Sequence, residues 1–358
     1  MFLFCGCSQN TTPSLSGKIY KDAKFDCADL DLNEDDFTNA GFKFGDSLDV
    51  EFSNGYKIVD VPYYNGYYVK TGEPVVAAYP NNDYVVIANN NADLWSIVGL
   101  KDGMSVTLTL NTKKKYLKTQ EALGQDYSLL REEFDSDEQF TNFRSLKGGS
   151  LKENLIYRGA SPVDNSRNRA SYANALIEEA GINCIIDLAD SDEDMQNYFA
   201  SATFNSDYAK KLYEEGNAIV LSMSSDIYSI GFKQGVKKAV EHMLNHSGPY
   251  YIHCMEGKDR TGFVCLILEA LAGASYDEMC ADYMTTYANY YGITKEGTPE
   301  KYQAIVSLYF NTFLENITDI SDDDQLIQLS YTHSAIEYLL ECDLSDDEIN
   351  QLIDLISE

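Results

Sequence analysis

Basic residues are scarce in this chain of 358 residues, which holds 27 lysines and arginines against 57 aspartates and glutamates. The formal net charge is -30, and a surface of that sign repels the phosphate backbone of nucleic acids. The composition therefore argues against nucleic acid as a partner. Any anion-binding site in such a chain must be built locally, from a few cations and backbone amides placed against the overall field.

Long apolar runs and paired metal-binding cysteines are missing as well. No segment approaches the roughly 20 apolar residues that a membrane-spanning helix needs. The eight cysteines do not form two pairs with the spacing of a zinc site, and a disulfide framework is not expected at this length. We therefore expect neither a metal nor an organic cofactor.

The first residues, MFLFCGCSQNTTPSLSG, resemble the cleavage box of a bacterial lipoprotein with Cys7 as the lipidated residue, although the charged and long apolar parts of a signal are absent. Two interpretations stay open for residues 1–19: a leader remnant followed by a flexible tether, or an apolar terminus without function. The first predicts an extracytoplasmic protein tethered to a bacterial membrane through the lipid on Cys7. Otherwise the protein is expected to be secreted or cytoplasmic.

Hydrophobic residues make up 44% of the chain, so it can bury a core, and its length predicts more than one domain. Residues 20–118 hold short runs rich in valine, isoleucine and tyrosine between Asn, Asp and Gly turns, which predicts a small all-β barrel. Residues 119–149 are polar and acidic and are interpreted as a connector with some helix. Residues 150–358 are interpreted as a second domain with a helical carboxyl-terminal part.

Strands alternate with helices in the first half of this second domain. The segments INCIIDLA, NAIVLSM and PYYIHC are apolar runs typical of buried parallel strands. Helical patterns stand before and between them. This order predicts an α/β domain whose central, mainly parallel sheet is flanked by helices.

One loop of this domain carries a thiol and a guanidinium at its two ends. In HCMEGKDRTG, Cys254 follows an apolar strand, and Arg260 stands at the start of an apolar helix. Such a loop lies at the carboxyl edge of a parallel sheet, where α/β proteins bind ligands. The amides from Met255 through Glu256 and Lys258 to Arg260 can wrap around an oxyanion, and the helix N-terminus adds positive potential.

These features predict a cysteine nucleophile for phosphoryl transfer. The helix end and Arg260 lower the pKa of Cys254, so that its thiolate can attack phosphorus while the guanidinium holds the phosphate oxygens. Thr261 is placed to donate a hydrogen bond to the sulfur and help it leave, and His253 to orient the loop. Gly257 gives the backbone the freedom that a tight wrap requires.

The loop HCMEGKDRTG also resembles the signature of the cysteine-based tyrosine phosphatase superfamily, and within it the bacterial branch of tyrosine and lipid phosphatases. The blocks LIYRGASP and AGINCIIDLAD are similar to the two leading blocks of that branch. The resemblance implies that Cys254 is the nucleophile, that Arg260 binds phosphate, and that Lys258 and Asp259 serve in substrate binding and acid catalysis. It implies phosphotyrosine as substrate, often phosphoserine or phosphothreonine, and in places phosphoinositides.

Two positions depart from that branch. Ala189 stands where relatives often carry arginine, and Glu256 puts an acid inside the loop at a position that many relatives keep neutral. Both predict weaker binding of highly charged inositol phosphates.

The general acid stays open between two aspartates. Asp259 lies within the loop, whereas Asp226, in LSMSSDIYS, follows a buried strand upstream, as does the mobile-loop aspartate of most of the superfamily. We favour Asp259, since the sequence around it matches the branch that lacks the mobile acid. Arg158, at the end of a strand, is predicted either to touch the substrate phosphate or to pair with an acidic residue.

The amino-terminal part carries a second resemblance. Over residues 40–110, the sequence YYNGYYVKTGEPVVAAYPNNDYVVIANNNADLWSIVGLKDGMSVTLTL is similar to the carboxyl-terminal β-barrel of the S-adenosylmethionine hydroxide adenosyltransferases. The catalytic domain of that family has no counterpart in this chain, so the resemblance implies a shape and not a reaction.

Together these patterns predict a phosphomonoesterase acting through a cysteinyl-phosphate, most simply a protein tyrosine or dual-specificity phosphatase. A phosphatase of phosphoinositides or inositol phosphates is the alternative within the same chemistry. The partner would thus be a phosphorylated protein, a phospholipid or an inositol phosphate. An alternative of another class is a surface protein that binds phosphorylated ligands without turnover. Such a protein would normally lose the cysteine or the arginine, and neither is lost.

Overall fold

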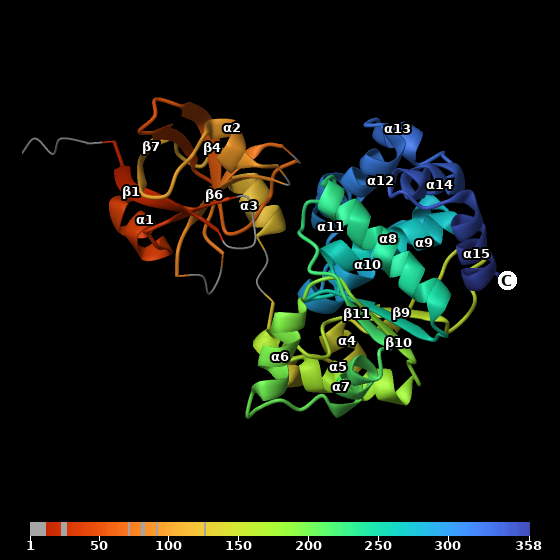
Figure 1. The fold of residues 1–358 in the computed structure, drawn as a ribbon. Helices are drawn as coiled ribbons and strands as arrows, with labels where there is room; N and C mark the ends of the chain where they lie inside the picture. The colour runs from red at the N-terminus through yellow and green to blue at the C-terminus, as the bar shows by residue number, and fades with distance from the viewer. Residues whose placement is uncertain (1–11, 23–26, 71, 80–82, 91, 125–126) are drawn as a thin grey trace, which may run out of the picture. The chain divides into compact units, whose positions relative to one another are not determined.

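The computed structural model describes residues 12–22, 27–70, 72–79, 83–90, 92–124 and 127–358. The chain divides into two compact units, Met1–Gln125 and Asp126–Glu358 (Figure 1). The sequence analysis predicted that the second domain starts at residue 150, after a connector at residues 119–149. Cys7, the candidate lipidation site, lies outside the described residues.

The first unit is a closed barrel, ordered β1-β2-β6-β5-β4-β3-β7 in the described residues. Its elements are β1 (Ser14–Lys21), β2 (Ala28–Leu30), α1 (Glu34–Ala40), β3 (Ser47–Phe52), β4 (Lys57–Tyr64), β5 (Pro74–Ala77), β6 (Val86–Asn89), α2 (Leu94–Val98), β7 (Met104–Thr112) and α3 (Leu117–Leu123). All neighbouring strands pair antiparallel except β4 and β5. The all-β barrel predicted from the sequence is confirmed.

One part of the predicted tether was wrong, because β1 begins at Ser14 and pairs with β7. Serine-rich composition suggested a flexible segment. On the outer face of a barrel, however, small polar residues can pair across strands: the hydroxyls of Ser16 and Thr107 lie 2.9 Å apart. Ile19, in the same strand, reaches the barrel core and is fully buried.

The second unit contains a five-stranded sheet ordered β11-β10-β12-β9-β8. Its strands are β8 (Arg144–Ser145), β9 (Ile156–Gly159), β10 (Cys184–Asp187), β11 (Ala218–Val220) and β12 (Tyr250–His253). The four strands β9 to β12 are parallel, and the short β8 pairs antiparallel with β9 at the edge. The mainly parallel sheet expected from the apolar runs is confirmed.

Helices cover both faces of this sheet, with α8, α9 and α10 on one side and α5 and α7 on the other (Figure 1). They are α4 (Asp137–Thr141), α5 (Ala170–Glu179), α6 (Asp192–Ala200), α7 (Asp207–Glu214), α8 (Ile230–Asn245), α9 (Asp259–Leu271), α10 (Tyr276–Tyr291), α11 (Pro299–Ile305), α12 (Asn311–Thr318), α13 (Asp323–Leu326), α14 (Thr332–Glu341) and α15 (Asp346–Ile356). Short 3-10 turns occupy Arg131–Glu133 and Asn165–Arg167, and a π-helical segment, Val306–Phe310, joins α11 to α12.

The position of α9 fixes the loop that precedes it. Every residue of this helix from Thr261 to Leu271 is buried, which explains why the sequence there is apolar without a helical period. The helix contacts β9, β12 and α14. Because strand β12 lies between β9 and β10, the β12–α9 loop emerges near the centre of the sheet's carboxyl edge.

Candidate active site

The backbone carbonyls of the β12–α9 loop are tied to the surrounding protein. Each of the four residues after Cys254 has its carbonyl oxygen bonded by a donor from another segment or from the following helix turn. The donors are the Ser161 amide to Met255 (3.1 Å), the Tyr290 hydroxyl to Glu256 (2.8 Å), the Arg158 and Asn142 side chains to Gly257 (2.9 and 3.2 Å), and the Gly262 amide to Lys258 (2.9 Å).

With the carbonyls fixed outward, the loop amides are left for a ligand. Within the described part of the chain, no hydrogen bond is donated by the amides from Met255 to Arg260. Consecutive free amides of this kind form a nest for an anion, and the N-terminus of α9 contributes its partial positive charge at the same place. The predicted oxyanion cradle is therefore present in the backbone.

Gly257 is required by the geometry of this wrap. Its φ is +66°, a left-handed conformation that side chains rarely adopt, and a Cβ atom there would lie 2.1 Å from the carbonyl oxygen of Gly159. The loop thus packs directly against the end of β9. Any side chain at this position would push the loop away from the sheet.

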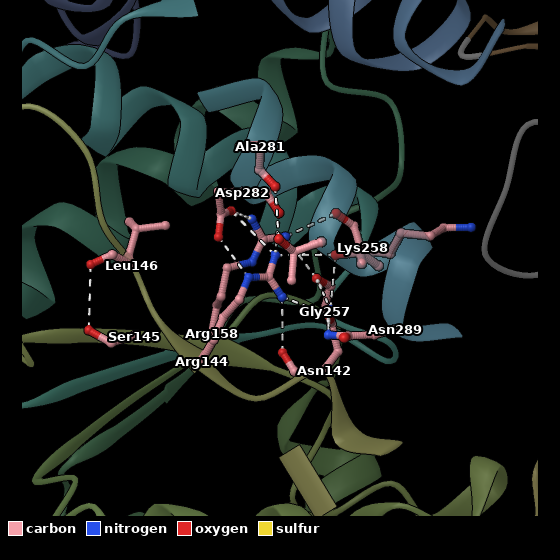
Figure 2. Close-up of polar contacts among 12 residues, drawn as sticks. Asn142, Arg144, Ser145, Leu146, Arg158, Gly257, Lys258, Ala281, Asp282 and Asn289 are labelled. Atoms are coloured by element: carbon pink, nitrogen blue, oxygen red, sulfur yellow. Dashed lines mark hydrogen bonds and ion pairs between the residues drawn. The ribbon is translucent and has the colours of Figure 1, made fainter. Parts of the chain in front are cut away.

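A buried ionic network supports the loop from the side of its carbonyls (Figure 2). Arg158 donates to the Gly257 carbonyl at 2.9 Å and to the Lys258 carbonyl at 3.4 Å, and it pairs with the carboxylate of Asp282. Arg144 pairs with the same carboxylate at 2.7 Å. Of the two roles predicted for Arg158, pairing with an acid is the one found, because its fully buried guanidinium holds protein carbonyls and a carboxylate.

Asn142 joins this network to α10. Its side-chain amide donates to the Gly257 carbonyl at 3.2 Å and to the Thr286 hydroxyl at 3.0 Å, while its carboxamide oxygen accepts from Arg144 at 2.6 Å and from Asn289 at 3.0 Å (Figure 2). Asn142, Arg144, Asp282 and Tyr290 were missed by sequence reasoning. Arg144 stands in the polar stretch that the sequence assigned to a connector, where nothing local distinguishes it. Asp282 gives no local signal.

Cys254 is 4% exposed at the bottom of the nest. Burial alone would raise the pKa of its thiol, but the charge of Arg260 and hydrogen bonds from the hydroxyl and amide of Thr261 outweigh burial and lower the pKa below its ordinary value. The Thr261 hydroxyl oxygen is buried and has no other hydrogen-bond partner in the described residues. The thiolate expected from the sequence thus has its physical causes in place.

Arg260 is oriented by the segment after β11. One terminal nitrogen, Nη1, donates to the Met223 carbonyl at 2.8 Å, and the Met223 amide in turn donates to Leu188 after β10 at 2.9 Å. This bond leaves the other nitrogens of the guanidinium for a ligand in the loop. Planar N–H donors of this kind match the oxygens of a phosphate group.

His253 closes the bottom of the site and is fully buried. Its Nδ1 lies 3.3 Å from the Cys254 carbonyl oxygen, and its Nε2 lies 3.8 Å from Oδ2 of Asp187. Burial lowers the pKa of His253 to about 4, so the ring is neutral at physiological pH. Its predicted part in orienting the loop fits the contact with the Cys254 carbonyl.

Two charged side chains, Lys258 and Asp259, lie at the outer end of the loop, 3.7 Å apart. Burial opposes the charge on Lys258, but Asp259 and then Tyr291, Tyr287 and Glu256 raise its pKa well above the ordinary value. The Lys258 ammonium also lies 5.8 Å from the ring centre of Tyr287. Asp259 is half-exposed, and its negative charge opposes the lowering of the Cys254 pKa by Arg260 and Thr261.

Asp226, the other candidate acid, lies in the turn before α8. Its carboxylate accepts a hydrogen bond from the Tyr228 amide at 3.0 Å, and its carbonyl accepts from the Ser229 hydroxyl at 2.8 Å. Ser229 caps α8 by accepting from the Phe232 amide. In this conformation Asp226 shapes the turn that starts the helix.

No helix in the described ranges is long and apolar enough to cross a membrane. One group of side chains with the ligand types and spacing of a metal site occurs among the described residues, namely Asp22, Cys27 and Asp29 of the barrel. The nest in the second unit is lined by amides and by Arg260, which suit an anion.

A cysteine with a lowered pKa at the base of an amide nest, next to a guanidinium and a helix N-terminus, is the arrangement of a cysteine-based phosphatase. A sequence model described as tyrosine phosphatase family matches residues 137–358, more than half of the chain, and the chain belongs to that family. The predicted superfamily is thereby confirmed. The likeness of the barrel to the adenosyltransferases stays a prediction.

Two solved structures are similar to parts of the chain. One is the core catalytic domain of the PP-IP phosphatase SIW14 from S. cerevisiae, in complex with citrate, with 19% identity over 53% of this chain and 96% of that chain and a TM-score of 0.28. The other is an uncharacterized conserved protein from Thermotoga maritima, with 21% identity over 26% of this chain and a TM-score of 0.23. This chain spans 35% of the length of the Thermotoga protein. No curated protein matches the chain.

Proposed function

We propose that this phosphatase hydrolyses phosphate monoesters through a cysteinyl-phosphate intermediate and that its substrate is a phosphotyrosine-containing or dual-specificity protein target. The observation that carries the proposal is the lowered pKa of Cys254 within an amide nest that Arg260 closes. This combination supplies a nucleophile and a receptor for the same phosphoryl group.

In the first step, the Cys254 sulfur attacks phosphorus, a sulfur–phosphorus bond forms, and the bond from phosphorus to the ester oxygen breaks. Arg260 and the loop amides stabilise the negative charge on the three equatorial oxygens. The departing oxygen takes a proton from Asp259. In the second step, water attacks phosphorus and gives a proton to Asp259, while the sulfur leaves as a thiolate that accepts hydrogen bonds from Thr261.

Asp259 is preferred over Asp226 as the acid for two reasons. Asp259 stands in the first turn of α9, beside Arg260 in the loop that carries Cys254, and its charge acts on the thiol. The Asp226 carboxylate is engaged by a backbone amide of its own turn. A general acid must come within hydrogen-bond reach of the oxygen that it protonates.

An aromatic rim supports an aryl phosphate as substrate. The buried Tyr290 of α10 donates to the loop carbonyl of Glu256, and the partly exposed rings of Tyr127 and Tyr291 contact it with ring centres 5.5 and 6.3 Å away. Stacked and edge-on ring pairs are favourable contacts for another aromatic ring. The ring of phosphotyrosine matches this chemistry better than an inositol ring does.

The test is hydrolysis of p-nitrophenyl phosphate and of a phosphotyrosyl peptide by the full chain. We expect turnover that vanadate inhibits and that Cys254→Ser abolishes, while the matched variant Cys280→Ser, whose thiol lies in α10, retains it. A chain that binds the phosphopeptide but turns over no phosphate ester would instead be a non-catalytic phospholigand binder.

A pH profile of kcat tests the choice of acid. Asp259→Asn should lose the basic limb of the profile, whereas Asp226→Asn should keep it. The reverse result would assign the acid to the turn before α8.

A further inference from the structure

Glu256 is an acid built into a loop whose chemistry is the binding of an anion. Its carboxylate accepts a hydrogen bond from the Tyr127 hydroxyl and lies 3.5 Å from Nε of Arg167. Its side chain is only 16% exposed. Burial raises its pKa above the ordinary value and the charge of Asp259 adds to this rise, while the cations Lys258 and Arg260 oppose it.

The partners that hold Glu256 are themselves fixed in place. The Tyr127 ring stacks on Tyr290 at 5.5 Å and meets Tyr291 edge-on at 5.4 Å. The Arg169 guanidinium lies 4.9 Å from the centre of the Tyr127 ring and 4.6 Å from that of Tyr290. Glu256 is thus held by an ordered rim and is not a side chain free to swing into solvent.

The Glu256 carboxylate also pairs with Arg167, a cation that could otherwise bind a phosphate group of the substrate. Arg167 ends the 3-10 turn Asn165–Arg167, and its buried Nε has no hydrogen-bond partner in the described chain, with the Glu256 carboxylate as its ion-pair partner. At the other end of the loop, Asp259 lies 3.7 Å from the Lys258 ammonium in the same way. Of the two cations in the loop itself, Lys258 and Arg260, only Arg260 has no carboxylate at ion-pair distance in the described residues.

We propose that Glu256, held by Tyr127 and Arg167, is a specificity-determining residue that restricts the site to substrates with a single phosphate group. A phosphate dianion fills the amide nest and takes Arg260. A second phosphate group on the same small molecule meets the Glu256 carboxylate, with Arg167 already paired. Repulsion between the Glu256 carboxylate and a second phosphate group weakens binding of the multiply phosphorylated ligand and does not strengthen binding of the singly phosphorylated one.

This inference rests on the proposed monoesterase activity, and Glu256→Gln tests it. Glutamine keeps the shape and the oxygen that accepts from Tyr127, but it removes the charge and frees Arg167. We expect kcat/KM for inositol hexakisphosphate, divided by kcat/KM for p-nitrophenyl phosphate, to rise at least tenfold. Glu214→Gln, an exposed change of the same charge on α7, should leave that ratio unchanged.

A double variant separates the roles of the two residues. When Glu256→Gln is combined with Arg167→Gln, the ratio of kcat/KM for inositol hexakisphosphate to that for p-nitrophenyl phosphate should lose most of its increase. The reason is that the freed Arg167 guanidinium is the group that binds the additional phosphate. Inhibition of p-nitrophenyl phosphate hydrolysis by inositol hexakisphosphate, relative to inorganic phosphate, gives the same comparison where turnover of the inositol compound is slow.

The outcomes distinguish this inference from the function on which it rests. A wild-type chain that hydrolyses no phosphate ester overturns the proposed function. A wild-type chain that hydrolyses p-nitrophenyl phosphate, with a substrate ratio and inhibition unchanged in Glu256→Gln, overturns the specificity role alone. A wild-type chain that already prefers inositol hexakisphosphate also overturns it.

Discussion

Next to the nucleophile, two buried carboxyl groups, those of Asp187 and Asp190, bind a proton more tightly in the folded chain than in the unfolded chain. Oδ2 of Asp187 and Oδ2 of Asp190 are buried and have no hydrogen-bond partner in the described residues, and burial raises the pKa of Asp187 to about 6. Burial and then the charge of Asp187 raise the pKa of Asp190 to about 8. His253, neutral and 3.8 Å from Asp187, supplies no compensating charge.

The variant Asp190→Asn removes this titration and keeps the contacts. The Tyr198 hydroxyl, which donates to Oδ1 of Asp190 at 3.1 Å, can donate to the carboxamide oxygen instead. The new amide group takes the place of Oδ2 of Asp190, which has no hydrogen-bond partner in the described residues. A residue without a charged form therefore satisfies the same partners, and we expect the variant to be more stable than the wild type above pH 5.

The sign and size follow from proton linkage. The unfolded chain releases the Asp190 proton near the ordinary value of 3.8, whereas the folded chain holds it to about 8. The unfolded state thus binds fewer protons across this window, so wild-type stability falls as pH rises, by at most about 1.4 kcal/mol per pH unit for one group. Because the group is coupled to Asp187, we expect the variant to gain roughly 2–4 kcal/mol at pH 7.5 and about zero at pH 4.

Urea unfolding of the full chain, followed by far-UV circular dichroism between pH 4 and 8.5, measures this difference. The helical signal comes mainly from the second unit, and the comparison with Asp324→Asn, an exposed aspartate on α13, removes the general effect of one lost charge. A stability difference that stays constant across the pH range would refute the reasoning, as would a variant that is less stable than wild type at pH 7.5.

Three further changes test the loop and its support. Gly257→Ala should reduce kcat at least a hundredfold, because the added Cβ would meet the carbonyl oxygen of Gly159. Gly216→Ala, whose Cβ would meet open space, should keep kcat, and equal activities of the two variants would contradict the packing. Asp282→Asn should lower the free energy of unfolding by about 3–5 kcal/mol in urea titration, since it leaves two buried guanidiniums without their carboxylate. Alkylation of Cys254 by iodoacetamide should have a pH midpoint below that of an ordinary thiol, and Arg260→Gln should raise it; an unchanged midpoint would contradict the assigned cause.

The catalytic loop could be predicted because its information is local. Cys254 and Arg260 are ends of one short loop, and the apolar run before it and the apolar helix after it determine where that loop must lie in a parallel sheet. The strands β10 and β12 were predictable for a related reason: every residue of both is buried, and a strand buried on both faces needs an apolar side chain at nearly every position. The edge strand β11 is only partly buried, but its short apolar run was still recognisable.

The support of the loop could not be predicted, because it depends on pairings between distant segments. Arg144 and Asp282 are 138 residues apart in sequence and meet only when α10 packs against the edge of the sheet. The strand that carries Arg144 has two residues and no apolar pattern. Tyr127, whose hydroxyl donates to Glu256, is likewise distant from it in sequence. It lies at the start of the second unit, in a stretch that the sequence assigned to a connector.

The support also explains how a chain with a net charge of -30 can bind an anion at this loop. Arg144 and Arg158 both pair with the carboxylate of Asp282, while burial and then the charge of Asp282 raise the pKa of nearby Glu269 well above its ordinary value, which favours its neutral form. Two positive charges therefore stand against one negative charge beneath the loop. These arginines attract the carbonyl oxygens of the β12–α9 loop. Because the C=O and N–H of a peptide unit point in opposite directions, a carbonyl that points toward the arginines leaves its N–H pointing into the nest. One buried surplus charge thus orients the amides and offsets the acidic field where phosphate binds.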